Sequence, residues 1–373
     1  MIKNYTAKLN FTALIAFVIL ASLLVSCSSN EKKKIPSISK TYQDYFPIGV
    51  AVSSYLLHDS ATADFVKRQF NSITPENEMK PENLQPEEGK FTWKRADRIA
   101  NFAANNGMKL RGHCLVWHQQ TPDWFFMDGN DTASAELVFK RMKDHIYAVV
   151  NHFKGKAYCW DVVNEAISDD STKFLREESP WLKICGPSFI DSAFVYAHQA
   201  DPSAKLFYND YNVVRPEKAA RVYRLLKELK SRGVPVDGVG IQAHWSLYEP
   251  SAEELRDVID KFKSLGLDVQ FTELDVSVFK WEKNFREIRP SDNLAYTDSL
   301  ANVLADKYSE LFSIFREYHE SITGVTFWSV SDRTTWLNYY PVRGRQNYPM
   351  LFDTLLKPKK AFWDVVEFNK ENQ

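Results

Sequence analysis

Cysteine is scarce in this chain, and its few cysteines exclude two classes of stabilising chemistry. The 373 residues contain four cysteines. Outside Cys27, the remaining three, Cys114, Cys159 and Cys185, are an odd number without the spacing of metal ligands. They predict neither a disulfide framework nor a metal site. We expect buried thiols that pack as small apolar side chains.

Excess charge of either sign is also missing. Lysine and arginine total 47 and aspartate and glutamate 48, so the formal net charge is −1. No basic region suited to nucleic acid and no phosphate-binding loop occurs, so we expect no nucleic-acid partner and no cofactor. With 44% hydrophobic and 25% charged residues, the chain has the composition of a globular protein. We also expect a monomer. Aromatic residues reach 14%; most should fill cores, but several lie beside polar motifs.

The first 26 residues predict a targeting signal rather than part of the fold. Lys3 and Lys8 precede the apolar run Phe11–Val25, which is too short for a stable membrane span. The run leads into Leu-Val-Ser-Cys, which resembles the bacterial lipoprotein signal, with lipidation at Cys27; an ordinary secretory signal is the alternative. Residues 27–43 predict a flexible tether. We therefore expect a membrane-anchored lipoprotein, periplasmic or at the cell surface.

Residues 44–370 alternate short apolar runs with amphipathic helical patterns such as Ala219–Ser231 and Ala252–Leu265, and no low-complexity linker divides them. One domain is the simplest interpretation. Eight strand and helix alternations predict an α/β fold with a parallel sheet closed into a (β/α)8 TIM barrel; a doubly wound open sheet is the alternative. The expected strands are Pro47–Val52, Ser72–Pro75, Lys109–Val116, Tyr158–Val163, Lys205–Asn209, Val239–His244, Asp268–Thr272 and Gly324–Ser329.

Several of these strands turn polar at their downstream ends. The fourth runs directly into Asn164 and Glu165, and the seventh into Glu273. Because the carboxyl ends of barrel strands meet at one face, we expect these side chains to surround a single site. The strand ends are rich in carboxylates, amides, imidazoles and indoles, which suit a neutral substrate rich in hydroxyl groups, and carbohydrate is the economical candidate.

Cleavage of a glycosidic bond needs two carboxyl groups in different protonation states. Glu165 and Glu273 are the best pair, and Asp275 could orient His244, which in turn could keep Glu273 ionised. A separation of about 5–5.5 Å would give retention of configuration and roughly 6.5–9.5 Å inversion. Two alternatives stay open: each glutamate could cap a helix or pair with an arginine, and His113, His244 and carboxylates could bind a metal, although no compact ligand motif supports this.

Seven sequence motifs follow one another along the chain. They are TPENEMKP (74–81), GHCLVWHQQTPDW (112–124), WDVVNEA (160–166), LFYNDYN (206–212), GVGIQAHW (238–245), FTELDV (271–276) and TFWSVSDRTTWL (326–337). Taken together, they resemble glycoside hydrolase family 10, the endo-β-1,4-xylanases, over roughly Pro47 to Phe368. The resemblance implies a TIM barrel that cleaves xylan internally with retention of configuration and without a cofactor.

The resemblance also implies a role for each matching residue. Glu165 matches the acid/base, Glu273 the nucleophile, and His244 the hydrogen-bond partner of the nucleophile. Asn164 matches the amide that binds the 2-hydroxyl of the sugar under attack. A non-proline cis peptide is implied after His113. The remaining matches hold sugars in the cleft: Glu76, Asn77, Lys80, His113 and Trp117 on the glycone side, Tyr211 and Gln242 in the pocket, and Trp328 and Trp336 in the aromatic wall.

The sequence departs from the family pattern at a few positions. Cys114 replaces a usual threonine, Gln119 a common serine, and Ser329 a usual glycine. The stretches Asp169–Pro187 and Trp281–Asn293 occupy loop positions where sugar subsites differ most. Two further functions remain possible: the same chemistry on β-glucan or mixed-linkage chains, and a non-catalytic surface glycan-binding protein, which would require the loss of a catalytic carboxylate.

Overall fold

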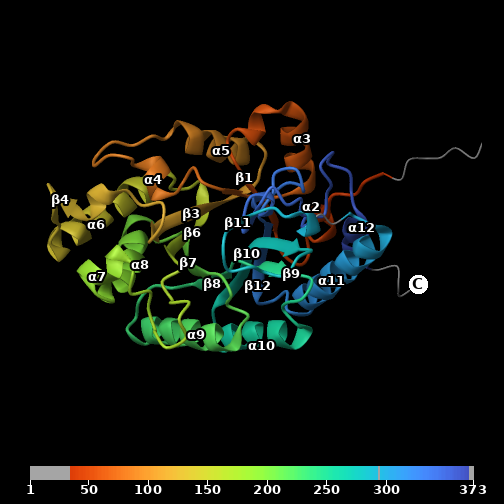
Figure 1. Cartoon of the computed structure of the whole chain (residues 1–373). Helices are drawn as coiled ribbons and strands as arrows, with labels where there is room; N and C mark the ends of the chain where they lie inside the picture. Colours follow the sequence, from red (N-terminus) through yellow and green to blue (C-terminus); the bar gives the residue numbers. More distant parts are fainter. Residues whose placement is uncertain (1–33, 293–294, 369–373) are drawn as a thin grey trace, which may run out of the picture. The chain divides into compact units, whose positions relative to one another are not determined.

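The computed structural model of the chain describes residues 34–292 and 295–368 (Figure 1). The predicted signal segment, Cys27 and Asn293 lie outside these residues. A compact unit begins at Pro36, earlier than the predicted start at residue 44. Helix α2 (Ile38–Thr41) is capped by Ser37, and Ile38 and Tyr42 are fully buried. The predicted tether therefore overlaps the folded unit, because an apolar pair at helical spacing packs this segment onto it.

Eight parallel strands close into a barrel. Hydrogen bonds join them in chain order, and the eighth pairs with both the seventh and the first, where Phe327 lies opposite Val50. The predicted TIM barrel is confirmed, and the open sheet is excluded. The strands are β1 (Ile48–Val52), β2 (Ser72–Pro75), β3 (Lys109–Trp117), β6 (Ala157–Asn164), β7 (Lys205–Asp210), β8 (Gly238–Ile241), β10 (Asp268–Ser277) and β12 (Ile322–Phe327).

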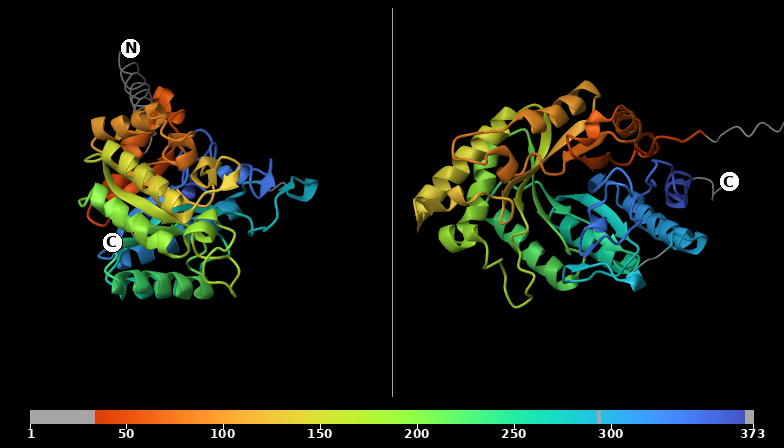
Figure 2. Two further views of the ribbon diagram at one scale, coloured as in Figure 1. Left: turned by 90° about the vertical axis from the view of Figure 1, so that its left-hand side faces the viewer. Right: turned by 45° about the horizontal axis from the view of Figure 1, so that its top comes forward.

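Helices cover the outside of the barrel (Figure 2). The longer ones are α3 (Ser60–Gln69), α5 (Lys94–Asn105), α6 (Ala135–His152), α8 (Ser188–Ala200), α9 (Pro216–Ser231), α10 (Ala252–Lys263), α11 (Asp298–Glu317) and α12 (Lys360–Val366). Short helices are α4 (Pro81–Leu84) and α7 (Pro180–Cys185), with 3-10 turns at Leu56–His58, Asp123–Phe125, Pro290–Asp292 and Trp336–Asn338. No helix in the described ranges has the length and apolar character needed to cross a membrane.

Helix α10 shows how the sequence determines where an outer helix begins and which of its faces is buried. Ser251 and Glu254 form a capping box at its start, each accepting a backbone N–H of the other. The predicted apolar positions at helical spacing are all buried: Leu255, Val258, Ile259 and Phe262. Burial of each such side chain contributes roughly 1.5–3 kcal/mol, so this face fixes α10 against the barrel.

The predicted strand Val239–His244 is divided in the structure. It forms β8 and, after a break, the short strand β9 (His244–Ser246), which pairs with β10. The break lies at Ala243, whose φ of 62° is in the left-handed region that strands exclude. Outside the barrel, two small sheets join β4 (Met127–Asp128) to β5 (Asp131–Thr132) and β11 (Arg286–Glu287) to β13 (Val342–Arg343).

Candidate active site

A cavity of about 350 Å³ lies at the carboxyl ends of the barrel strands. Both predicted catalytic glutamates line it, together with most of the predicted sugar-binding residues. The lining residues are Lys80, His113, Trp117, Gln119, Glu165, Tyr211, Asn212, Gln242, His244, Glu249, Glu273, Trp281, Trp328, Trp336 and Tyr340. Glu76, Asn77, Asn164 and Asp275 are not in the lining, and the last three bond to residues that are.

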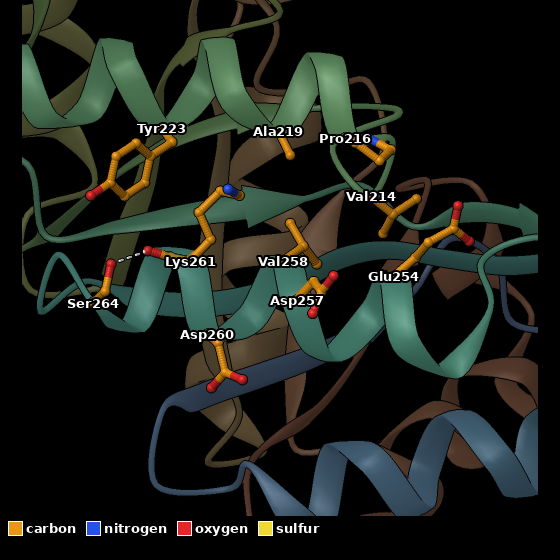
Figure 3. Close-up of a pocket in the computed structure, with 10 residues that line it drawn as sticks. All are labelled: Val214, Pro216, Ala219, Tyr223, Glu254, Asp257, Val258, Asp260, Lys261 and Ser264. Carbon is orange, nitrogen blue, oxygen red and sulfur yellow. Dashed lines mark hydrogen bonds between the residues drawn. The ribbon is translucent and has the colours of Figure 1, made fainter.

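A second surface cavity, of about 590 Å³, lies between α9 and α10 (Figure 3). It is lined by side chains of the two helices and of the segment before α9, such as Tyr223, Asp257 and Lys261. None of the polar strand ends reaches it. Although it is the larger of the two, it is a groove between neighbouring outer helices, and neither of the predicted catalytic glutamates lines it.

Glu165 stands directly after β6 with a φ of 58°. This left-handed conformation costs roughly 1–2 kcal/mol for a residue with a side chain. Three sets of hydrogen bonds hold it. The Glu165 N–H donates to the carbonyl of Asn209 (2.8 Å), its carbonyl accepts from Nε of Arg176 (3.1 Å), and the next two backbone N–H groups donate to Oη of Tyr208 (3.0 Å each). The turn therefore fixes the direction of the carboxyl group.

Among the described residues, the carboxyl group of Glu165 accepts hydrogen bonds from two neutral donors. Nε2 of Gln242 donates to Oε1 (2.9 Å) and Nε1 of Trp117 to Oε2 (2.8 Å). Burial, followed by the charge of Asp210, raises the pKa of Glu165 above its usual value, and these two hydrogen bonds do not offset the rise. Glu165 is therefore shifted toward its protonated form relative to an exposed glutamate, and this is the form that a general acid needs.

Glu273 lies in β10 and is equally buried, but its pKa moves in the other direction. Burial alone would raise it, but the hydrogen bond from Nε2 of His244 (3.1 Å), the charges of His113 and His244 and the hydrogen bond from Nδ2 of Asn209 (2.9 Å) lower the pKa below the usual value. Glu273 is therefore held as a carboxylate, the form that a nucleophile needs.

His244 keeps Glu273 ionised because Asp275 keeps His244 charged. Nδ1 of His244 lies 2.9 Å from Oδ2 of Asp275. Burial would lower the pKa of His244, but the charge and hydrogen bond of Asp275, together with Glu273, raise it to about 10. Nε1 of Trp336 donates to the same Asp275 oxygen (2.8 Å). The predicted orienting contact between Asp275 and His244 is present.

Amide side chains connect the two glutamates. Oδ1 of Asn164 accepts from Nδ2 of Asn209 (2.9 Å) and from Nε2 of Gln242 (3.4 Å). Asn209 also donates to Glu273, and Gln242 also donates to Glu165. A continuous network thus fixes the positions of both carboxyl groups relative to Asn164.

The β2 and β3 sector supplies a cation and an imidazole to the cavity. Nζ of Lys80 donates to Oδ1 of Asn77 (3.0 Å) and lies 5.0 Å from the centre of the Trp117 ring. Nδ1 of His113 lies 2.9 Å from Oδ2 of Asp161. The peptide bond between His113 and Cys114 is cis, which confirms the expectation. Glu76, at the end of β2, is half-buried, and burial raises its pKa.

Aromatic rings form the β12 side of the cavity. The Trp328 ring lies 5.4 Å from that of His113, and the Trp336 ring 4.9 Å from that of His244. Tyr211 faces them from the end of β7. Its Oη donates to Asp169 and accepts from Nη2 of Arg176 (2.9 Å), so the segment after β6 fixes its position.

Residues 37–368 match the model of glycosyl hydrolase family 10. The chain belongs to this family. It is 46% identical over 362 residues to a β-1,4-xylanase of Dictyoglomus thermophilum (96% of this chain, 99% of the relative) and 44% identical over 343 residues to an endo-1,4-β-xylanase of Geobacillus stearothermophilus (91% and 99%). The crystal structure of xylanase XynB from Paenibacillus barcinonensis with a conduramine derivative is similar, with a TM-score of 0.85 at 42% identity, covering 90% of this chain and 99% of that one.

The departures from the family 10 pattern fit the structure locally. Cys114, Cys159 and Cys185 are free and buried, as predicted. The Ser329 hydroxyl is buried and bonds to Oγ1 of Thr334 (2.6 Å) and to a backbone carbonyl. Gln119 contributes to the cavity lining. The thiol of Cys114 is therefore buried as an apolar group, and the hydroxyl of Ser329 has hydrogen-bond partners.

Sequence reasoning missed several residues of this family 10 site. Asn209 and Asp210 lie in the quoted strand-end motif LFYNDYN, so the polar end of β7 was a usable signal. Trp281 and Tyr340 line the cavity, and Arg176 bonds to the Glu165 carbonyl. Arg176 and Trp281 lie in the two loop stretches named from the sequence, but these segments have no periodic pattern that shows which side chain reaches the site.

Proposed function

We propose that this chain is a retaining endo-β-1,4-xylanase with Glu165 as the acid/base and Glu273 as the nucleophile. One observation carries the assignment: two buried carboxyl groups in one cavity have pKa values shifted in opposite directions, upward for Glu165 and downward for Glu273. That divergence assigns one proton donor and one carboxylate, as glycoside hydrolysis requires. Family membership supports retention and xylan as the substrate.

The cycle uses the electrostatic coupling of the two groups. In the first step Glu273 attacks the anomeric carbon while Glu165 protonates the departing glycosidic oxygen. The negative charge of Glu273 contributes to the raised pKa of Glu165. Once Glu273 is an ester that charge is gone, so the pKa of Glu165 falls and it can deprotonate the water that releases the sugar.

Sugar binding is assigned to the residues around the pair. Asn164, which is linked to both glutamates by hydrogen bonds through amides, is suited to the 2-hydroxyl of the sugar under attack. The indole faces suit the apolar faces of pyranose rings. The residues proposed to hold sugars are Glu76, Asn77, Lys80, His113, Trp117, Tyr211, Gln242, His244, Trp328 and Trp336, with Asp275 orienting His244.

Replacement of the nucleophile tests the assignment. Glu273→Ala should abolish release of reducing ends from xylan while the fold and xylan binding persist. Azide added to this variant should restore cleavage of an activated aryl xylobioside and yield a glycosyl azide of inverted configuration, because the small anion occupies the space of the lost carboxylate. Glu249→Gln, another glutamate of the cavity, should cost less than about tenfold in kcat/KM. Near-normal turnover of xylan by Glu273→Ala would refute the assignment.

A second substrate is favoured by one relative. An exoglucanase, XynX, of Acetivibrio thermocellus is 42% identical over 347 residues, covering 90% of this chain and 30% of that protein. The same chemistry on β-glucan or mixed-linkage chains is therefore the alternative, and comparison of product release from xylan and from β-glucan separates the two. A non-catalytic glycan-binding role has no such support, since both carboxyl groups line the cavity.

We also propose that the protein is a monomeric lipoprotein with residues 1–26 as signal peptide and lipid on Cys27, facing the periplasm or the cell surface. The support is the Leu-Val-Ser-Cys sequence after a short apolar run. Growth with a radiolabelled fatty acid should label the wild-type protein, whereas Cys27→Ala should remain unlabelled and leave the membrane fraction. Labelling of the alanine variant would contradict the proposal.

A further inference from the structure

A lysine is buried behind the turn that carries Glu165. Lys218 is the third residue of α9, and its exposed fraction is 4%. Lysine is rarely buried unless its charge is paired, and the helix dipole further disfavours a cation in the first turn of a helix. Two unfavourable features at one position indicate that the ammonium group serves the site rather than the helix.

Two carboxylates and an aromatic ring surround the Lys218 ammonium group. Nζ lies 2.8 Å from Oδ1 of Asp210 and 3.2 Å from Oδ1 of Asp169. It also lies 3.7 Å from the centre of the Tyr211 ring, which lines the cavity. Asp210 is fully buried, whereas about half of the Asp169 side chain is exposed. Lys218 therefore compensates the buried charge of Asp210.

Asp210 connects this lysine to the acid/base. Its Oδ2 accepts from Oη of Tyr208 (2.5 Å). The same hydroxyl accepts the backbone N–H groups of Ala166 and Ile167 (3.0 Å each), directly after Glu165. Among the charges that raise the pKa of Glu165, that of Asp210 acts more strongly than that of the nucleophile. A change in the compensation of Asp210 should thus reach Glu165 by charge and through the hydrogen-bonded turn.

Ionisable groups face Lys218 and Glu165 from several neighbouring segments. Some are neutral near neutral pH, because burial raises the pKa of a thiol or phenol and lowers that of an imidazole; these are Cys114, His118, Tyr208 and Tyr211. The charged ones are Lys80 after β2, Asp169, Arg176 and Glu178 after β6, Asp210 on β7, His244 on β9 and Glu273 on β10. Arg176 bonds to Asp169 and Glu178, and His244 bonds to Glu273. Lys218 is the cation that pairs with Asp210.

We propose that Lys218 is a positioning residue that offsets the charge of Asp210 and so sets the alkaline limit at which Glu165 acts as general acid. Lys218 lies behind Tyr211 and is not part of the cavity lining. Without it, Tyr208 and the N–H of Tyr211 (2.8 Å) still donate to Asp210. An uncompensated negative charge would then favour the protonated form of Glu165. Loss of Asp210 would have the opposite effect. The inference rests on the proposed roles of the two glutamates.

Opposite shifts of the pH profile test this role. The measurement is the alkaline limb of kcat/KM for linear xylohexaose, whose leaving sugar needs a proton. Lys218→Met should move this limb to higher pH by roughly half a unit, and Asp210→Asn should move it to lower pH by a similar amount. The double variant removes no net charge, so its limb should lie between the two. A purely structural role would lower kcat in both single variants without moving their limbs in opposite directions.

Arg221→Met is the matched control. Arg221 lies one turn further along α9, is partly exposed, and donates to the backbone carbonyls of Ser168 and Lys173 (2.7 and 2.8 Å). Its removal takes a cation from the same helix face, but water screens an exposed charge, so the limb should stay in place. A second control is an aryl xylobioside whose acidic phenol departs without a proton. On this substrate the limbs of Lys218→Met and the wild type should coincide.

Each outcome decides a separate question. A limb that stays in place in Lys218→Met, or moves as in Asp210→Asn, would overturn the proposal. Thermal unfolding shows whether Lys218→Met is folded. If it is not, the double variant is compared with Asp210→Asn, because it leaves no buried carboxylate without a cation; its limb should lie at higher pH, and equal limbs would overturn the proposal.

The proposed function can fail separately. A wild-type protein that cleaves no xylan would overturn the xylanase assignment. An isotope-edited NMR titration of the Glu165 carboxyl group, assigned with Glu165→Gln, needs no turnover. It should show the highest pKa in Lys218→Met and the lowest in Asp210→Asn, and equal values in these two variants would contradict the role of Lys218.

Discussion

At the scale of single residues, the two glutamates differ in their neighbours rather than in their burial. Glu165 is 7% exposed and Glu273 4%. Neutral donors, Gln242 and Trp117, bond to Glu165, whereas a charged imidazole, His244, bonds to Glu273. Desolvation raises the pKa of any buried carboxyl group, so the two are distinguished by the charges and hydrogen bonds around them: the charge of Asp210 raises the pKa of Glu165 further, whereas His244 and His113 lower that of Glu273.

The same contrast predicts the pH dependence of activity. Activity needs Glu273 ionised and Glu165 protonated, so it should fall as pH drops below the lowered pKa of Glu273 and as pH rises above the raised pKa of Glu165. His244→Asn removes a hydrogen bond and a positive charge while burial remains. The pKa of Glu273 should therefore rise, and the acid limb of the kcat/KM profile should move to higher pH. An acid limb that stays in place would contradict this role.

Arg176 should act as a positioning residue for the acid/base. Its guanidinium group bonds to the Glu165 carbonyl and to Oη of Tyr211. Arg176→Lys keeps the charge but loses the fork that reaches both acceptors. We expect kcat to fall about tenfold with a small change in KM, because the carboxyl group loses its fixed direction.

Steady-state kinetics on xylan check the Arg176 prediction. Arg224→Lys is the control, since Arg224 is an exposed arginine paired with Glu228. Equal kcat values for Arg176→Lys and the wild type would show that other contacts suffice to hold Glu165.

The sequence predicted these residues unevenly, for physical reasons. The predicted pair and the amides and imidazoles around it lie at strand ends, where topology alone brings them together. Asp210, at the polar end of β7, belongs with them. Arg176 reaches the Glu165 carbonyl through a contact between loops, and no periodicity predicts which loop side chain does so. Residues positioned by topology could thus be predicted, and those positioned by loop packing could not.

At the scale of elements, the hydrophobic pattern located each barrel strand but not the residue at which it ends. The apolar runs predicted all eight barrel strands, but four of them extend further than predicted: the third, fourth, fifth and seventh end at Trp117, Asn164, Asp210 and Ser277. The sixth ends early because Ala243 is left-handed. Hydrophobic patterns show which residues of a strand are buried. They do not show where polar residues extend the hydrogen-bonded strand, or where a residue with positive φ ends it.

Helix α10 offers a stability prediction at this scale. Ser251→Ala removes the side chain that accepts from the N–H of Glu254 and should lower the free energy of unfolding by about 1 kcal/mol. The expected fall in Tm is roughly 2–4 °C. Ser264→Ala is the control at the other end of the same helix, where the hydroxyl is exposed and bonds to the carbonyl of Lys261 (Figure 3). Calorimetry should show a smaller change for it, and equal changes would contradict the capping role.

At the scale of the whole molecule, residues that stabilise the fold and residues that catalyse the reaction lie at opposite ends of the barrel strands. Chain segments that enter before β1 lie at the amino ends of the strands, whereas the catalytic groups lie at the carboxyl ends. The N-terminal segment should therefore matter for folding and not for the reaction. Tyr42 shows its anchorage: Oη donates to the carbonyl of Val365 (2.8 Å) and accepts from Nη1 of Arg316 (2.8 Å).

Two shortened chains test where the folded unit begins. A chain that starts at residue 36 should match the Tm of one that starts at residue 27, because it retains α2 and Tyr42. A chain that starts at residue 44 loses the buried side chains of Ile38 and Tyr42, each worth roughly 1.5–3 kcal/mol, so it should unfold at a clearly lower urea concentration. While folded at low temperature it should keep its kcat on xylan, since the carboxyl ends of the strands are untouched. Equal urea midpoints for the chains starting at 36 and 44 would show that the α2 segment is a tether after all.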